Sequence, residues 1–211
     1  MTTVVYDGKY LACDSRTTRS ALPGKAPVTC GTCGTESPKL ISTRNKLRTP
    51  QKGKEPIRFE GDVVVAWASA GASSMIEAVD KILSAGLNPK QVLSTMTSLS
   101  ISQMIGCTTL IVTDKHVYRM TVDGTHVGVT KHPLNEHQFC GSGASAARLM
   151  LKHYPLTAFE ATFFAADADP GSGGAVQYID ISTGELQTVS EKTQKDFLKK
   201  FFKKPPKSLG V

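Results

Sequence analysis

The stretch that decides the fold reads Thr2-Thr3-Val4-Val5-Tyr6, then Asp7-Gly8, then Lys9-Tyr10-Leu11-Ala12-Cys13-Asp14. The β-branched and aromatic residues at 2–6 favour a strand, and Asp-Gly is a strong signal for a tight hairpin turn. Residues 9–14 then return as a second strand. A hairpin here would hold Thr2 rigidly at a point where a chain otherwise frays.

Thr2 has a chemical meaning of its own because it follows Met1 directly. Small residues in this position usually permit removal of the methionine, which would leave a free α-amine beside the Thr2 hydroxyl. That amine can act as the base for the hydroxyl nucleophile, so no histidine is needed. Its ordinary pKa is about 7.7–8.0, so a useful fraction is neutral at cellular pH. Most chains that begin Met-Thr are not such hydrolases, so the remaining residues must decide.

The composition is that of a soluble globular protein, with 40% hydrophobic and 20% charged residues in 211. This length suits one domain, which we expect to span residues 1–203. No apolar run approaches the ~20 residues of a membrane span, and no secretory signal is visible. The five cysteines are an odd number in such a chain. We therefore expect mostly reduced thiols and a cytoplasmic protein.

The positive charge is concentrated at one end of the chain. The net charge is +7, and the seven lysines and one acid of residues 192–211 account for all but about +1 of it. The body is nearly neutral, which argues against a nucleic-acid-binding surface. Residues 204–211 are expected to form a basic tail that is disordered or contacts an acidic partner.

The hydrophobic pattern predicts an alternation of strands and helix pairs along the rest of the chain. A loop is expected over residues 15–38 and again over 44–56, around a short strand at 39–43. Further strands are expected at 62–69, 107–113, 116–122, 125–130, 138–140, 175–181 and 185–190. Helices are expected from about 72 to 85, 89 to 104, 144 to 153, 155 to 166 and 193 to 203. This order predicts an α+β fold in which two antiparallel sheets pack face to face, with a helix pair outside each.

Five short motifs in this order resemble the proteasome β-type peptidases, including the HslV-like bacterial branch and short phage relatives. They are Thr2-Thr3-Val4-Val5, Asp14-Ser15-Arg16, Ala70-Gly71-Ala72, Gly141-Ser142-Gly143 and Asp169-Pro170-Gly171-Ser172-Gly173-Gly174. Each motif is weak alone, but together they span residues 2–174. The resemblance implies a four-layer αββα sandwich, the N-terminal nucleophile (Ntn) hydrolase fold. It also implies a threonine peptidase.

The resemblance assigns a role to each matching residue. Thr2 would be the nucleophile, and Asp14 would hold a catalytic lysine. Ser142, Asp169 and Ser172 would orient the Thr2 amine and relay its proton. Each also has a plain structural interpretation: Asp14 can simply end a strand, Ser142 can cap a helix, and 169–174 can be a surface loop.

The resemblance also assigns a catalytic lysine, an oxyanion donor and a substrate-pocket residue. Lys39 resembles the family's lysine before apolar residues, and Lys46 is a competing register that we rank below it. Gly71 would donate its N–H to the oxyanion, although a small residue also suits any strand-to-helix turn. Ser69, two residues earlier, stands where the family places a specificity-pocket side chain.

Metal and cofactor chemistry finds little support in the sequence. Cys30-Gly31-Thr32-Cys33 is half of a zinc or redox motif, but a second half is missing, so a plain loop is favoured. We expect no cofactor and no metal. No phosphate-binding GxxxxGK[ST] motif is present, so the chain is not itself an ATPase.

The resemblance also implies partners, and two rival functions stay open. The substrate would be a peptide or unfolded protein, cleaved in a homo-oligomeric ring that works with a separate ATP-dependent unfoldase. One rival is an inactive Ntn-fold scaffold or assembly protein, in which a retained Met1 blocks the amine. The other is an Ntn amidase that acts on small amides.

Overall fold

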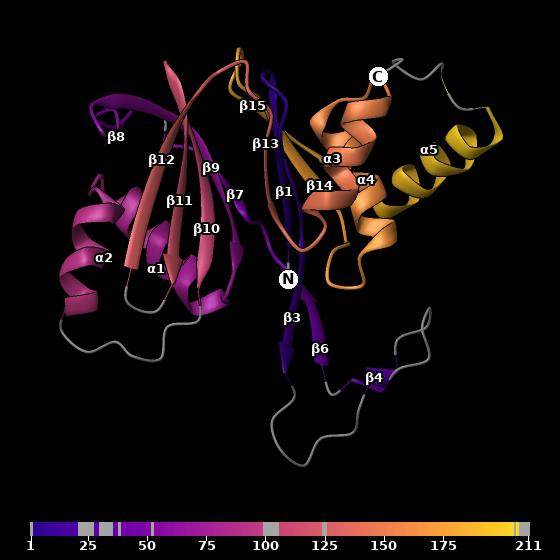
Figure 1. Ribbon diagram of the computed structural model, residues 1–211, viewed down its shortest axis with the longest axis horizontal. Helices are drawn as coiled ribbons and strands as arrows, with labels where there is room; N and C mark the ends of the chain where they lie inside the picture. Colours follow the sequence, from indigo (N-terminus) through magenta and orange to yellow (C-terminus); the bar gives the residue numbers. More distant parts are fainter. Residues whose placement is uncertain are drawn as a thin grey trace.

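The computed structural model describes residues 2–20, 28–29, 36–37, 39–51, 53–98, 106–123, 126–204 and 206. Over these residues the protein is a mixed α+β structure with two large antiparallel sheets, two smaller two-stranded pairs and five helices. Figure 1 shows the two sheets side by side, with helices outside each of them.

The first sheet is built around the predicted N-terminal hairpin. Its strand order is β13 (Gln138–Gly141), β1 (Thr3–Tyr6), β2 (Tyr10–Asp14), β14 (Val176–Asp180) and β15 (Glu185–Val189). The hairpin turn is stabilised by Asp7, whose Oδ1 accepts hydrogen bonds from the backbone N–H groups of Lys9 and Tyr10. Gly8 has a φ of +97°, a conformation in which glycine carries no Cβ penalty. The hairpin prediction is therefore confirmed.

The second sheet is centred on the long buried strand. Its order is β12 (His126–Pro133), β11 (His116–Asp123), β10 (Cys107–Thr113), β9 (Asp62–Gly71) and β7 (Leu47–Arg48), and β8 (Arg58–Phe59) also pairs with β9. The apolar run 62–69 predicted β9, and nearly all of its residues are buried or half-buried. Strand pleating sends Trp67 to one face and Ala68 to the other.

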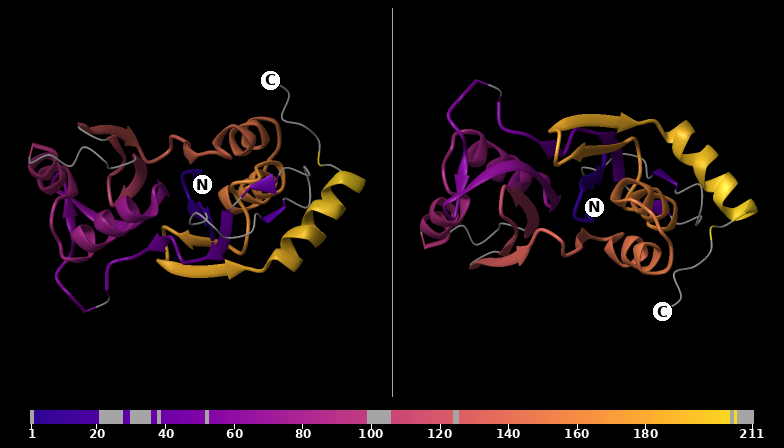
Figure 2. Two further views of the ribbon diagram at one scale, coloured as in Figure 1. Left: turned by 90° about the horizontal axis from the view of Figure 1, so that it is seen from below. Right: turned by 90° about the horizontal axis from the view of Figure 1, so that it is seen from above.

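The helices and the two sheets form four successive layers, and apolar side chains fill the three interfaces between them. The faces of the two sheets enclose one cluster, to which Val4, Leu11, Ala68, Leu110 and Val112 belong. Helices α1 (Ser73–Ser84) and α2 (Pro89–Ser98) cover the outer face of the second sheet. Helices α3 (Ala144–His153) and α4 (Ala158–Ala168) cover the outer face of the first. Figure 2 shows the same order of layers from above and below, with the start of the chain near the middle.

The last helix, α5 (Glu191–Lys203), packs beside α4 as the amphipathic pattern predicts. Leu198 and Phe201 are buried, whereas Phe202 stays exposed. Ser190 caps the helix by accepting a hydrogen bond from Thr193 N–H, so α5 begins earlier than predicted. The basic tail lies mostly outside the described residues, apart from Lys204 and Pro206.

The predicted loops contain short strands that the sequence pattern missed. Strand β3 (Arg16–Ser20), which was missed, pairs with β6 (Lys39–Thr43), which confirms the strand predicted at 39–43. The two form a ribbon that projects from the body in Figure 1. Two further pieces, β4 (Val28–Thr29) and β5 (Glu36–Ser37), pair with each other. The loop prediction for 15–38 is wrong at these residues, because polar strands such as Arg-Thr-Thr-Arg-Ser carry no alternation of apolar residues. Cys30 and Cys33 lie outside the described residues.

Local capping places the start of α4 later than the hydrophobic pattern predicts. Helix α4 begins at Ala158, not at Pro155, because Thr157 and Glu160 form a reciprocal capping box. Asp7 in the N-terminal hairpin also accepts a hydrogen bond from Ala158 N–H, at 2.6 Å. The hairpin turn and α4 are thereby joined directly. Of the helices in the described ranges, none has the length and apolar character needed to cross a membrane.

Candidate active site

Thr2 lies between the two sheets at the start of β1, with only 3% of its surface exposed. Its carbonyl oxygen accepts a hydrogen bond from Ser142 N–H at 3.1 Å. Gly141 makes this close approach possible, because a Cβ at that position would overlap the Thr2 carbonyl oxygen. The turn between β13 and α3 therefore fixes the backbone of Thr2. Met1 lies outside the described residues.

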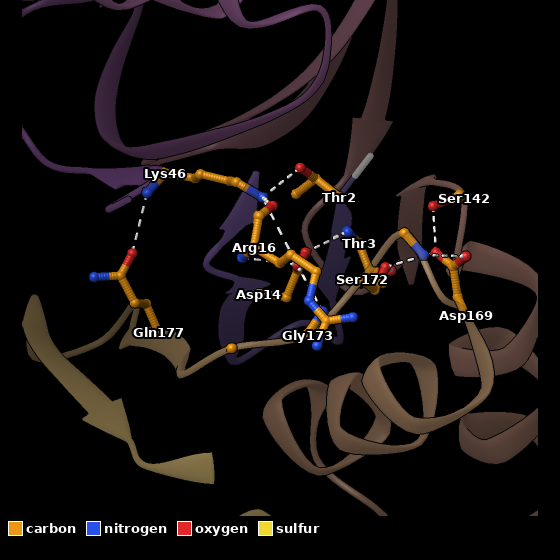
Figure 3. Close-up of polar contacts among 12 residues, drawn as sticks. Thr2, Thr3, Asp14, Arg16, Lys46, Ser142, Asp169, Ser172, Gly173 and Gln177 are labelled. Atoms are coloured by element: carbon orange, nitrogen blue, oxygen red, sulfur yellow. Dashed lines mark hydrogen bonds and ion pairs between the residues drawn. The ribbon is translucent and has the colours of Figure 1, made fainter. Parts of the chain in front are cut away.

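The amine of Lys46 contacts the side chain of Thr2. Lys46 Nζ donates a hydrogen bond to Thr2 Oγ1 at 2.5 Å and another to the carbonyl oxygen of Arg16. It also lies 3.7 Å from Asp14 Oδ2. Figure 3 shows the lysine extended from its own backbone toward Thr2, with Asp14 beside its amine. The lysine is 1% exposed, so this charge is removed from water.

Asp14 is fully buried and is held by backbone donors. It accepts hydrogen bonds from the N–H groups of Thr3 at 2.6 Å, Gly173 at 3.0 Å and Arg16 at 3.2 Å. Burial raises the pKa of Asp14, and Lys46 and these three donors oppose that rise. Burial likewise lowers the pKa of Lys46, against the attraction of Asp14. The amine beside Thr2 therefore loses its proton more readily than an exposed lysine does.

The structure corrects the lysine assignment from Lys39 to Lys46. In the ribbon, Thr43 pairs with Arg16 and Lys39 pairs with Ser20, four residues further along. At about 3.3 Å per residue, Lys39 starts ~13 Å beyond the point where the lysine amine meets Arg16. This is more than a lysine side chain can span. The sequence pattern did not reveal that β3 pairs with β6, which holds the backbone of Lys39 away from Thr2.

A second group of polar side chains lies on the other side of Thr2. Asp169 Oδ2 accepts hydrogen bonds from the hydroxyls of Ser142 and Ser172, the latter at 2.7 Å. Ser172 Oγ also lies 2.7 Å from Thr3 Oγ1. The structure therefore brings Ser142, Asp169 and Ser172 together, although they come from two turns far apart in the sequence (Figure 3).

The environment of Asp169 favours its charged form. Burial raises the pKa of this carboxyl, but hydrogen bonds from Ser142, Ser172 and Gly171 N–H lower it. The net effect is a pKa below the ordinary value. A carboxylate fixed here can orient neighbouring hydroxyls and accept a proton through them.

A pocket of about 330 Å³ opens beside Thr2. Its wall includes Gly71, Gly141 and Ser142, together with Cys107 and Val122 from the second sheet. Gly71 has a φ of +137°, and a Cβ there would lie 2.5 Å from the Gly106 carbonyl oxygen. Only glycine fits this position in the pocket wall, because any side chain there would collide with the backbone of residue 106.

Ser69 does not line this pocket, and its place in a specificity pocket stays a prediction. Its side chain is fully buried and its Oγ lies 2.8 Å from Thr109 Oγ1. Strand pleating places Ser69 on the helix-covered face with Trp67, whereas Ala70 faces the first sheet and lines the pocket.

Sequence reasoning missed two neighbours of the lysine. The Arg16 carbonyl accepts from its amine, and Gln177 Oε1 accepts from its backbone N–H at 3.1 Å. A buried glutamine in β14 carries no motif, so nothing in the sequence pointed to Gln177. Within the described ranges, no group of three or more His, Cys, Asp or Glu side chains is arranged to hold a metal.

Comparisons with known proteins leave the interpretation to this geometry. A scan against protein-family models gave no match for the chain, and a search of curated proteins gave none either.

Proposed function

We propose that the protein is a threonine peptidase that cleaves peptide bonds through Thr2 after removal of Met1. The observation that carries this proposal is the 2.5 Å contact between Lys46 Nζ and Thr2 Oγ1, with Asp14 behind the amine. A buried cation beside a hydroxyl lowers the free energy of forming the alkoxide. An ordinary structural threonine has no need of a buried lysine and carboxylate.

The proposed reaction has two stages. The free Thr2 amine takes the proton of the Thr2 hydroxyl as the hydroxyl oxygen bonds to the scissile carbonyl carbon. The N–H of Gly71, in the wall of the pocket, donates a hydrogen bond to the oxyanion that forms. The C–N bond breaks, the leaving amine takes up that proton, and an ester forms on Thr2. Water then hydrolyses the ester with the same amine as base. Asp169, Ser142 and Ser172 hold the amine and pass protons to and from it.

The fold and the assembly complete the proposal. The sequence of helix, sheet, sheet and helix layers supports the four-layer Ntn hydrolase fold. By the same resemblance, the substrate is a peptide or unfolded protein, and the chain assembles into a homo-oligomeric ring that a separate ATP-dependent unfoldase serves. Sedimentation should then show a species well above the 22.6 kDa of one chain. A peptidase that is strictly monomeric would contradict the ring.

The decisive experiment combines intact mass with a covalent probe. The mature protein should lack Met1 and should gain one adduct from an inhibitor directed at N-terminal threonine, and Thr2→Ala should gain none. Met1 retained on every molecule would replace the proposal with the scaffold function. Labelling without cleavage of a fluorogenic peptide panel, but with hydrolysis of small amides, would indicate the amidase.

A further inference from the structure

The lysine beside Thr2 is held at both ends by neighbouring strands of the first sheet. Its amine lies near Asp14 on β2, and its backbone N–H donates to Gln177 Oε1 on β14 at 3.1 Å. The two strands pair so that Gln177 stands opposite Cys13, next to Asp14. Figure 3 shows Lys46 extended between Gln177 and Thr2.

The segment that carries the lysine has little regular pairing at this point. Arg44 N–H donates to the Ser15 carbonyl at 2.9 Å, and ladder pairing with β9 starts only at Leu47. Between these anchors, the Lys46 N–H is held by a side chain instead of a backbone acceptor. The depth at which Lys46 enters the site therefore depends on Gln177.

The side chains of Arg44 and Arg48, on either side of Lys46, lead to a different part of the molecule. Arg44 pairs with Glu77 at 2.8 Å and Arg48 with Asp80 at 3.2 Å, both on α1. These pairs are partly exposed, so water screens them. Gln177, by contrast, is 3% exposed and belongs to the sheet that also carries Thr2. It is thus a buried link between the lysine backbone and the sheet that carries the nucleophile.

We propose that Gln177 is a positioning residue for Lys46. It sets the distance between the lysine amine and Thr2 Oγ1, and so the stabilisation that the amine gives to the reacting oxygen. This proposal rests on the proposed peptidase function, but it also predicts a property of Lys46 that does not require turnover.

The surroundings of Gln177 give water a route to the Lys46 N–H when the side chain is changed. A pocket of about 420 Å³ lies against it, lined also by Ser15, Arg44 and Asn45. In Gln177→Met, water entering from this pocket can satisfy the Lys46 N–H, so the buried donor is not left unpaired. A mobile water fixes the backbone less tightly than a packed side chain does.

The kinetic test uses three variants and a fluorogenic peptide. Gln177→Met should lower kcat about 10- to 100-fold with KM within about twofold, because small misplacements of reacting groups cost up to about 10²-fold. Gln177→Glu keeps an oxygen acceptor and should recover most of the rate. Gln138→Met is the matched control, because Gln138 is a buried glutamine of the same sheet that bonds Glu136 instead. It should behave as wild type.

Two kinetic outcomes would overturn the proposal. One is a Gln177→Met enzyme with unchanged kcat. The other is an equal loss in Gln138→Met, which would mean that any buried glutamine of this sheet is needed for stability alone.

A second readout separates this proposal from the peptidase function. Brief acetylation with acetic anhydride, followed by peptide mass spectrometry, compares Lys46 with Lys115, whose side chain is 64% exposed. Lys46 should be protected in wild type and in Gln138→Met, and its acetylation relative to Lys115 should rise at least about threefold in Gln177→Met. This rise in a protein without turnover would retain the positioning role and refute the peptidase. Turnover with no change in either readout would refute the positioning role alone.

Discussion

The two sides of Thr2 use different physical means to control charge. On one side Lys46 and Asp14 are buried, and burial dominates the pKa of both groups. On the other side Asp169 is half-exposed, and the hydrogen bonds from Ser142, Ser172 and Gly171 N–H together outweigh the effect of burial, so its pKa is lowered. The attraction within a buried ion pair is strengthened by the low dielectric constant around it. A network of hydrogen bonds instead fixes how its side chains are oriented. In the proposed reaction, Thr2 receives electrostatic stabilisation from one side and proton transfer from the other.

Removing the Thr2 hydroxyl should have the largest effect on activity. Thr2→Ala is expected to abolish turnover and leave unfolding almost unchanged, because a small side chain is lost while the paired strand β1 stays intact. Thr2→Ser should keep part of the activity, since the amine and hydroxyl remain on one residue. Peptide hydrolysis and thermal unfolding measure the two effects. Wild-type activity in Thr2→Ala would remove the nucleophile assignment.

Removing Lys46, on the buried side of Thr2, should have the second largest effect on activity. Lys46→Ala is expected to lower kcat/KM by about 10³-fold or more, since it removes the cation at the reacting oxygen. It should also destabilise the fold by about 3–5 kcal/mol, because Asp14 is left buried without its partner. Assays therefore belong well below the unfolding midpoint of the variant. Lys39→Ala, the control in the ribbon, should stay within about twofold of wild type.

The group of Ser142, Asp169 and Ser172, on the other side of Thr2, should contribute less to the rate than Lys46 does. Ser142→Ala is expected to lower kcat by about 10²-fold, at the low end of general acid–base effects, because Asp169 and Ser172 remain in place. Steady-state kinetics on the same peptide give the comparison with Lys46→Ala. If Ser142→Ala cost as much as Lys46→Ala, the proposed division between the two sides would be wrong.

The smallest effect should be on stability as a function of pH. Because the folded-state pKa of Asp169 is depressed, its contribution is fully present above the unfolded pKa, about 3.9, and is lost as pH falls through the folded pKa. The destabilisation caused by Asp169→Asn should therefore be larger at pH 6 than at pH 3. Urea unfolding at both pH values measures it. A destabilisation that grows toward pH 3 would contradict the depressed pKa.

Sequence patterns were most informative where the local signal and the tertiary structure agree. The hairpin of residues 2–14 and the buried strand β9 have strong patterns of their own, and both were predicted. The ribbon strand β3 was missed, because a polar strand outside the core has no hydrophobic period to reveal it. The ribbon also makes the segment between Asp14 and the site lysine longer than the resembling family has. For this reason the comparison with the family favoured Lys39, the nearer lysine, over Lys46.

The site was predictable only where its residues lie in motifs. Thr2, Asp14, Ser142, Asp169 and Ser172 come together in space as the motif order implied. Ser69 lies outside the pocket beside Thr2, because a motif position does not state which face of a strand it occupies. Gln177 was invisible because it acts on a backbone atom of another segment, and such a contact leaves no mark in local sequence.

The steric restriction at Gly141 has a consequence for how mutational scans of this protein should be interpreted. A scan that scores only activity would rank Gly141 beside Thr2, because any side chain there collides with the Thr2 carbonyl. Yet the proposed reaction gives Gly141 no part in bond making. Alanine at Gly141 should displace the first strand, whereas alanine at Thr2 should not. A paired scan of abundance and activity would therefore separate residues that react from residues that only make room.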